Sequence, residues 1–388
     1  MRVLISGGGL AGLTLAYWLQ KFGLTPVVIE QAHGIRRSGY GIDFFDTGYD
    51  VAERMDLIDG LAPQKIPVKY VAYVNTDGKV IAKLPLELME KVMYGKYLAL
   101  MHWTLEEALY QAVKDQVEVR FDCTLESVEQ SAEAVSVTYA DGQREMFDLL
   151  VGADGIHSNT RRLVFGPEER FARYLGYYVA CYPLADRFGI GHTWKNYTEP
   201  KRQVGAYCST NPGEAITLFM YEAKDEGEIP LEQRLPRLRR EFEGMGWITA
   251  GLLEAAPTPE QIYMDTVTQI QMPAWSQGRV ALVGDACYCL TLISGQGASM
   301  AMGGAYLLAQ ALHQEADYQA AFQVYESQIR PHIEKRQKGA RDFAKTFVPG
   351  SSLGLALQKI IMKGVLRDAF IPLLRKQFGA ESILPERS

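Results

Sequence analysis

The first thirty residues contain two short apolar runs, separated by a stretch in which apolar residues recur at helical spacing. Arg2–Ser6 is short, apolar and rich in β-branched residues, as expected of a buried strand. From Leu10 onward, apolar side chains recur at helical spacing until Gly23 interrupts them, and "PVVIE" follows as a second buried run. This pattern predicts one β-α-β unit with parallel strands.

Farther along the chain the pattern changes to a two-residue alternation. Residues 68–86 alternate on both sides of "NTDG", which predicts an antiparallel hairpin. Residues 174–264 contain several aromatic-rich runs bounded by turns, and we expect most of them to be antiparallel strands, with a charged helix over 231–243. Long helices are predicted over 297–313 and 318–345, and a helical tail begins at 353 and is divided by Pro372.

Composition and charge narrow the class of protein. The chain has 388 residues, of which 47% are hydrophobic and 22% charged, as in ordinary globular proteins of two or three domains. The net charge of −6 argues against a nucleic-acid partner, and five unevenly spaced cysteines are no disulfide framework. Neither a secretory signal nor an apolar run of the ~18 residues needed for a membrane span is seen, so we expect a cytoplasmic protein without an integral membrane segment.

A glycine motif, Gly7-x-Gly9-x-x-Gly12, lies between the first strand and the first helix. Its first glycine permits the tight turn, its second lets a pyrophosphate approach the backbone, and its third allows close helix packing. Glu30 ends the second strand, where a carboxylate accepts hydrogen bonds from a ribose diol and disfavours a 2′-phosphate, so the unit predicts FAD or NAD. The predicted cofactor residues here are Gly7, Gly9, Leu10, Ala11, Gly12 and Glu30.

Two further strand-to-turn elements carry aspartates. The first is "LLVGADGIHSNTRR" with Asp154 and Gly155, for which an ordinary Asp-Gly turn is the favoured interpretation when the segment is taken alone. The second is "VGDACYCLTLISGQGAS", in which Asp285 suits the ribityl hydroxyls of a flavin and the helix start after Gly295 suits negative charge on a reduced flavin ring. The predicted cofactor residues of this loop are Gly284, Asp285, Gly295, Gly297, Ala298 and Ser299.

Cys287 and Cys289 within that loop admit three interpretations, a metal site, a redox pair or packing. A metal needs about four ligands, and no other Cys or His pair has a matching spacing. A redox pair is more often Cys-x-x-Cys, so we expect no metal and favour packing of small buried side chains.

Together, the three motifs resemble those of the group A flavoprotein monooxygenases, single-component aromatic hydroxylases with the para-hydroxybenzoate hydroxylase fold. The resemblance extends in order over about residues 1–340, and "SGQGASMAMGGAYLLAQAL" is most similar to the tetracycline-inactivating branch. It implies FAD as the resident cofactor, served by Asp154, Gly155 and Asp285. It also places Arg36 near the FAD phosphates and His102 at a position where the family has an FAD-contacting arginine.

The architecture implied is α/β, with a GxGxxG (Rossmann-like) FAD-binding domain, a mixed-sheet substrate domain and C-terminal helices. We expect the FAD-binding domain to be discontinuous, over 1–67, 96–170 and 269–346. The substrate domain is expected over 68–95 and 171–268, and the C-terminal helices over 347–388.

The sequence departs from the family pattern at three places. Leu290, Thr291 and Leu292 replace prolines beside the flavin, His102 replaces an arginine, and Gly304 replaces an aspartate. A single histidine at a helix start also has a plainer role as a capping or surface group. These departures leave open whether hydroxylation survives.

The function predicted is therefore that of an FAD-dependent monooxygenase. It would use O2 and NAD(P)H, a transient co-substrate, to hydroxylate an electron-rich aromatic or polyketide-like small molecule. Tetracycline-type compounds are among the candidates, which would make the protein an antibiotic-resistance enzyme. The alternatives are a flavin-dependent oxidase or reductase of the same fold, and a non-catalytic flavoprotein that sequesters a ligand. No catalytic side chain is predicted, and the sequence fits a monomer or a homodimer.

Overall fold

The computed structural model describes residues 1–35, 39–291, 294–351, 354–355 and 382–384. Its first layer is a six-stranded sheet of order β17-β18-β11-β1-β2-β7. Strand β1 (Arg2–Ser6) lies between two parallel neighbours, β2 (Thr25–Ile29) and β11 (Leu149–Gly152). The other strands are β7 (Glu118–Arg120), β17 (Ser276–Gln277) and β18 (Val280–Leu282). Segments that are far apart in the sequence thus form one sheet, as the glycine-rich turns at its strand ends predicted.

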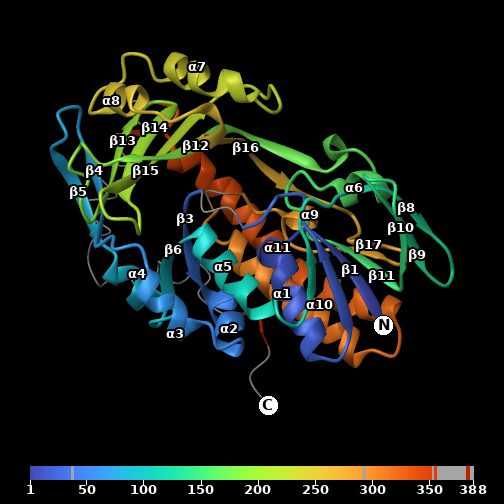
Figure 1. The fold of residues 1–388 in the computed structure, drawn as a ribbon. Helices are drawn as coiled ribbons and strands as arrows, with labels where there is room; N and C mark the ends of the chain where they lie inside the picture. The colour runs from blue at the N-terminus through green and yellow to red at the C-terminus, as the bar shows by residue number, and fades with distance from the viewer. Residues whose placement is uncertain (36–38, 292–293, 352–353, 356–381, 385–388) are drawn as a thin grey trace.

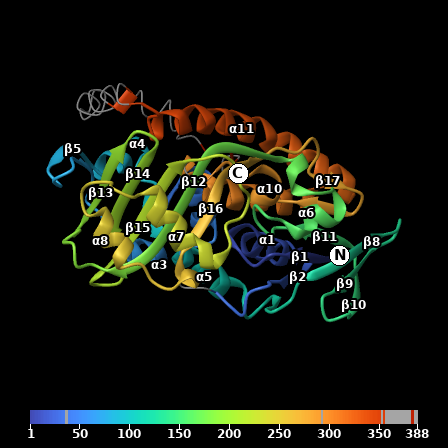
Figure 2. The same cartoon turned by 90° about the horizontal axis from the view of Figure 1, so that it is seen from above.

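Both faces of this sheet are apolar and covered: helices pack on one face, and a smaller antiparallel sheet packs on the other. Helix α1 (Leu10–Lys21) packs between α5 (His102–Val113) and α10 (Gly297–Gln314). Helix α11 (Tyr318–Phe347) packs on α10 and runs on past the second sheet (Figures 1 and 2). The largest group of buried apolar side chains lies between these helices and the sheet.

The second layer is a seven-stranded mixed sheet of order β16-β12-β15-β14-β13-β4-β5. It contains the predicted hairpin, β4 (Tyr70–Val74) and β5 (Val80–Pro85). The remaining strands are β12 (Ala172–Ala185), β13 (Thr193–Glu199), β14 (Arg202–Cys208), β15 (Glu214–Glu222) and β16 (Tyr263–Ile270). Helices α7 (Leu231–Glu241) and α8 (Thr249–Glu254) cover one face of it (Figure 1).

The two faces of this sheet have different partners because side chains alternate along each strand. On β12, Tyr178, Ala180 and Tyr182 belong to the core under α7 and α8. Val179, between them in the sequence, points the other way and lines a cavity.

Smaller elements complete the fold. Strands β8 (Leu125–Gln130), β9 (Val135–Tyr139) and β10 (Arg144–Phe147) form a separate antiparallel sheet, and β3 (Gly41–Phe45) pairs with β6 (Tyr97–Met101). The short helices are α2 (Asp46–Arg54), α3 (Ile58–Leu61), α4 (Glu87–Val92), α6 (Asn159–Val164) and α9 (Asp285–Tyr288). Single 3₁₀ turns occur at Ala62–Gln64, Glu168–Arg170 and Pro259–Gln261.

The predicted α/β class is confirmed, as are the opening β-α-β unit and the hairpin. The expected helices over 231–243, 297–313 and 318–345 appear with ends within two residues of the prediction. Most of the tail, including Pro372, lies outside the described residues, so its predicted helices stay a prediction. In the described ranges, no helix is both long enough and apolar enough to cross a membrane.

Candidate cofactor and substrate cavity

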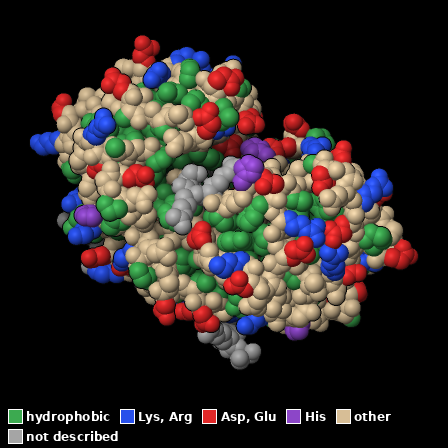
Figure 3. Space-filling view, in the orientation of Figure 1, with side chains coloured by type: hydrophobic (Ala, Val, Ile, Leu, Met, Phe, Trp, Pro, Cys, Tyr) green, Lys and Arg blue, Asp and Glu red, His purple; other side chains and the backbone are tan. Residues whose placement is uncertain are grey.

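One large cavity, of about 1400 Å³, lies between the two sheets. The ends of β1, β2 and β11 open into it from one side, and the face of the seven-stranded sheet away from α7 and α8 lines the other. The molecule is visibly hollowed between its two lobes, with hydrophobic side chains along the hollow (Figure 3). A site for a single small molecule typically measures 300–1,000 Å³, so this cavity has room for a dinucleotide together with a second ligand.

The three glycines of the opening motif have different surroundings. A Cβ at Gly7 would overlap the carbonyl oxygen of Ala153, and Gly7 has φ +113. A Cβ at Gly12 would overlap the carbonyl oxygen of Gly7, so both positions require glycine for the fold itself. A Cβ at Gly9 would come no closer than 3.9 Å to protein, at Glu106 Oε1, and would project into the cavity. The first turn of α1 has no side-chain cap, so its amides and this empty space fit a pyrophosphate.

Glu30 is held beside this turn by two backbone amides. Its Oε2 accepts a hydrogen bond from Gly8 N at 2.9 Å, and its Oε1 accepts one from Ala32 N at 2.8 Å. A carboxylate has about four acceptor positions, so capacity remains for a diol. Glu30 lines the cavity, which fits the ribose role predicted for it.

The loop after β18 brings a second carboxylate to the cavity. Asp285 begins α9 directly after Gly284, whose φ is +69, and it lines the cavity. Burial raises the pKa of Asp285 to about 6, so at neutral pH this side chain is mostly an anionic acceptor. That state suits hydrogen bonds from ribityl hydroxyls.

The N-terminus of α10 faces the same space. The helix has no side-chain cap, and Gly297 and Ala298 line the cavity together with Gly295. A Cβ at Gly295 would lie 3.4 Å from Oδ2 of Asp43 on β3, and Asp43 Oδ1 accepts a hydrogen bond from Tyr97 OH at 2.5 Å. Sequence reasoning missed Asp43. The signal available was its position in "GYGIDF", just after the segment that contains Arg36.

Most of the predicted cofactor residues come together in this cavity. Those that line it are Gly7, Gly9, Leu10, Ala11, Glu30, His102, Asp154, Gly155, Asp285, Gly295, Gly297 and Ala298. Gly12 and Gly284 lie behind the lining and shape the backbone. Ser299 is 1% exposed and donates a hydrogen bond from Oγ to the carbonyl oxygen of Phe45 at 2.6 Å, so it holds α10 against β3. Arg36 lies outside the described residues.

The Asp154 carboxylate accepts its hydrogen bonds from residues of its own loop. Its Oδ2 accepts hydrogen bonds from Thr160 N and Thr160 Oγ1, both at 2.8 Å, and Oδ1 accepts one from the Ser158 hydroxyl. This carboxylate therefore fixes the start of α6, and it borders the cavity.

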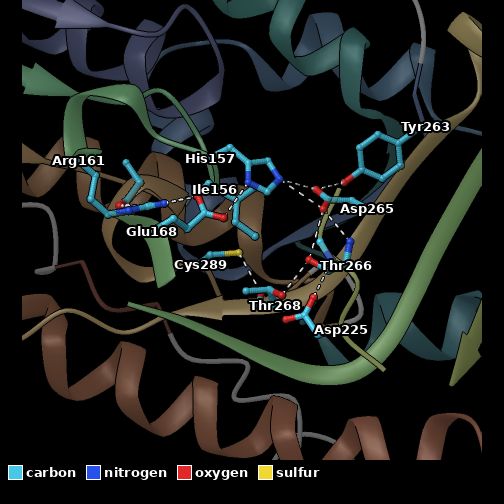
Figure 4. Close-up of polar contacts among 12 residues, drawn as sticks. Ile156, His157, Arg161, Glu168, Asp225, Tyr263, Asp265, Thr266, Thr268 and Cys289 are labelled. Carbon is cyan, nitrogen blue, oxygen red and sulfur yellow. Dashed lines mark hydrogen bonds and ion pairs between the residues drawn. The ribbon is translucent and has the colours of Figure 1, made fainter. Parts of the chain in front are cut away.

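A buried arginine ties the two aspartate loops together, and sequence reasoning missed it. Arg161 on α6 is 0% exposed and donates to the carbonyl oxygens of Ala286 at 2.8 Å and Ile156 at 2.6 Å. It also donates to Glu168 Oε2 at 2.6 Å (Figure 4). The side chain thus sets the relative position of the loops that carry Asp154 and Asp285.

His157 links the first of these loops to the seven-stranded sheet. Its Nδ1 lies 2.9 Å from Glu168 Oε1, and its Nε2 lies 3.3 Å from Asp265 Oδ2 on β16 (Figure 4). Hydrogen bonds with Asp265 and then Glu168 raise the pKa of His157 to about 10, so it is a cation at neutral pH.

His102, unlike His157, is uncharged at neutral pH. It begins α5 and lines the cavity, and its Nδ1 lies 3.8 Å from Glu106 Oε2. Burial lowers its pKa to about 4, so the imidazole is neutral at pH 7. Its neutral imidazole supplies no positive charge to this part of the cavity.

The Cys-x-Cys segment and the residues after it are mostly core. Cys287 and Cys289 are free and buried, and burial raises the pKa of both thiols well above the usual value, as packing side chains would require. Leu290 is 1% exposed in the main core and does not line the cavity, whereas Thr291 does. Thr291 has φ +114, a backbone conformation that proline cannot adopt. Leu292 lies outside the described residues.

The third departure, Gly304, has a local explanation. A Cβ there would overlap the hydroxyl of Tyr288, which hydrogen-bonds to the carbonyl oxygen of Met300 at 3.4 Å. The tyrosine takes the volume that an aspartate would need. Within the ranges that the structure covers, no three His, Cys, Asp or Glu side chains gather as a metal site would require.

The half of the cavity farther from the glycine turn is largely apolar. It is lined from the seven-stranded sheet by Val71, Leu84, Val179, Leu218 and Met220. Polar side chains interrupt this face at Tyr73, Trp194, Asn196, Tyr207 and Tyr263.

Comparison with known proteins agrees with this geometry. The profile of the FAD binding domain family matches residues 1–338. A protein named flavin-dependent monooxygenase, from an unknown prokaryotic organism, is 32% identical over 341 residues, covering 87% of both chains. Another flavin-dependent monooxygenase, from Legionella longbeachae, is 32% identical over 343 residues, again covering 87% of each chain.

Solved structures of similar proteins match this chain over nearly its whole length. The tetracycline destructase Tet(51) is similar with a TM-score of 0.84 and 28% identity, over 100% of this chain and 99% of that one. Klebsiella pneumoniae HpxO, solved with FAD and uric acid, shares the fold with a TM-score of 0.82 and 22% identity, over 98% of this chain and 97% of that one.

Proposed function

The chain belongs to the FAD-binding family of flavin-dependent monooxygenases, and from this premise we propose that it hydroxylates an electron-rich aromatic or polyketide-like molecule with NAD(P)H and O2. Tetracycline-type compounds are the first candidates, because the chain is similar over its whole length to a tetracycline destructase. The observation that carries the proposal is the single cavity, which joins Gly9 and Glu30 at one end to an apolar sheet face at the other.

The residues have distinct tasks in this proposal. Glu30 and the α1 amides hold the adenosine half, while Asp285 and the α10 N-terminus hold the flavin half. When bound, FAD would supply the redox chemistry, the transfer of reducing equivalents from NAD(P)H to O2. The seven-stranded sheet positions the substrate and excludes water from it with side chains such as Val179 and Met220.

The NAD(P)H co-substrate has no second GxGxxG unit of its own in the sequence. It would therefore bind transiently at the cavity, in keeping with its role as a reductant that leaves after hydride transfer. The basic side chains Lys335 and Lys338 of α11, at the cavity lining, are suited to its phosphates.

The test uses the purified yellow holoprotein. Its extracted cofactor should co-elute with FAD and not with FMN, and NADH and NADPH oxidation should be stimulated by a phenolic or polyketide compound that gains one oxygen atom by mass. NAD(P)H oxidation that yields only peroxide with every compound would favour an oxidase or reductase. Ligand binding with no stimulated oxidation would favour a sequestering protein.

A further inference from the structure

Two side chains of β13 that line the substrate half of the cavity carry buried polar atoms without partners among the described residues. Trp194 and Asn196 point to the same side of the strand, and both line the cavity. Asn196 is only 3% exposed, yet its Oδ1 has no hydrogen-bond partner in the part of the chain that the structure describes. The same is true there of Trp194 Nε1, which is also buried. Buried polar groups without partners are uncommon, and each is costly unless a ligand pairs with it.

Both atoms converge on one glycine of the next strand. Gly205 of β14 lies directly opposite Asn196 in the sheet register. A Cβ at Gly205 would be 2.7 Å from Asn196 Oδ1 and 3.1 Å from Trp194 Nε1. Because Gly205 has no side chain, the indole N–H of Trp194 and the side-chain amide of Asn196 both lie against its backbone. One donor and one amide, side by side, match an edge that carries a carbonyl oxygen next to an N–H or O–H group.

The charge around this pair excludes an anionic edge. No Lys or Arg of the seven-stranded sheet is among the described residues that line the cavity. The described cations of the lining are His157, which is paired with Glu168 and Asp265, and Lys335, Arg336 and Lys338 of α11, of which Arg336 is paired with Asp46 at 2.6 Å. A carboxylate at β13 would lose its hydration without gaining a counter-ion.

We propose that Trp194 and Asn196 determine substrate specificity by pairing with a neutral, carbonyl-bearing edge of a flat ligand, such as a carboxamide beside a hydroxyl group. The inference rests on the proposed function, because it takes this cavity to be the substrate site. Gly205 permits this arrangement, since a Cβ there would overlap Asn196 Oδ1 and displace the amide.

The test compares three probes that share a naphthalene ring: 1-hydroxy-2-naphthamide, 1-hydroxy-2-naphthoate and 1-naphthol. Binding to oxidised holoprotein is followed by the change in flavin absorbance, with no reductant present. The amide should bind at least tenfold more tightly than either other probe, which corresponds to about 1.4 kcal/mol. Asn196→Leu and Trp194→Phe should each remove most of that advantage and leave 1-naphthol binding nearly unchanged.

Lys195→Met is the matched control, because Lys195 lies between the two residues and donates to Gly189 O outside the cavity lining. It should keep the wild-type preference. The inference is overturned if the naphthoate binds as tightly as the amide, if no probe binds, or if both variants keep the amide preference. Should Asn196→Leu fail to retain flavin, Trp194→Phe decides alone. Since no turnover is measured, a failed hydroxylation assay leaves this result intact, and the two failures are distinguishable.

Discussion

Replacing Gly9 by valine tests the cofactor site without disturbing the fold. The Cβ of residue 9 would meet nothing within 3.9 Å, and Gly9 has φ −83, which valine also adopts. The apoprotein should therefore unfold within about 2 °C of wild type, equivalent to less than about 1 kcal/mol. The valine side chain, however, would occupy the space that a pyrophosphate needs beside the α1 amides. Losing two charge-assisted hydrogen bonds, at about 1.5–3 kcal/mol each, should weaken FAD binding at least 100-fold.

The assay is titration of apoprotein with FAD, followed by flavin fluorescence, together with thermal unfolding of the apoprotein. Two other glycines supply the comparison. Gly12→Val should lower the unfolding temperature as well as FAD binding, since a Cβ there would overlap Gly7 O. Gly60→Ala, at an exposed position with no atom within 4 Å, should change neither. Wild-type FAD affinity in folded Gly9→Val protein would refute the pyrophosphate assignment.

Four further substitutions separate cofactor contacts from supporting ones. Asp285→Ala should lower FAD affinity about tenfold and leave apoprotein stability unchanged. Asp154→Ala should chiefly lower stability, because the Asp154 carboxylate accepts hydrogen bonds from Ser158 and Thr160. FAD titration and thermal unfolding of both variants test this, and a larger loss of FAD affinity in Asp154→Ala than in Asp285→Ala would contradict it. Arg161→Met should cost about 3 kcal/mol in urea unfolding, since it leaves Ala286 O and the Glu168 carboxylate without their donor, and a loss under 1 kcal/mol would contradict this bridging role. His157 has a folded pKa of about 10, above the ordinary 6.5, so its stabilisation is complete below pH 6.5 and is lost as the pH rises through 10. Because the ring is half exposed, the free energy of unfolding of wild type should exceed that of His157→Gln by under about 1 kcal/mol at pH 7. In urea unfolding this difference should vanish near pH 11, and a difference that grows with pH would contradict the charge assignment.

The sequence predicted those parts of the site that depend on backbone geometry. Gly7 and Gly12 were identifiable because their motif reflects local sterics, and Glu30 because it directly follows the strand next to the glycine turn. Leu10, Trp18 and their neighbours predicted α1 because the helical period of its buried side chains is visible in the sequence.

What the sequence did not predict depends on contacts across long separations. Arg161 bonds to Ala286, which is 125 residues away, and no local pattern marks that arginine as buried. The unpaired atoms of Trp194 and Asn196 are equally invisible, because they are recognised only when β13, β14 and β4 lie in one sheet. The role expected for Leu290 as part of the flavin wall was incorrect, since the loop turns this side chain into the core and leaves Thr291 facing the cavity.

The dinucleotide end of the cavity must stabilise the charge of a pyrophosphate although α5 begins there with a neutral histidine, His102. A pyrophosphate carries two negative charges, and the described lining there includes Glu30, Glu106 and a neutral His102, with no Lys or Arg. Backbone amides and the N-terminal dipole of α1 must therefore supply most of the stabilisation within that lining. A helix terminus contributes a partial positive charge of only about half a unit, so a cationic side chain at this end would add strongly to the stabilisation of a pyrophosphate. We therefore propose that Arg36, which stands between Glu30 and Asp43 in the sequence, supplies this charge.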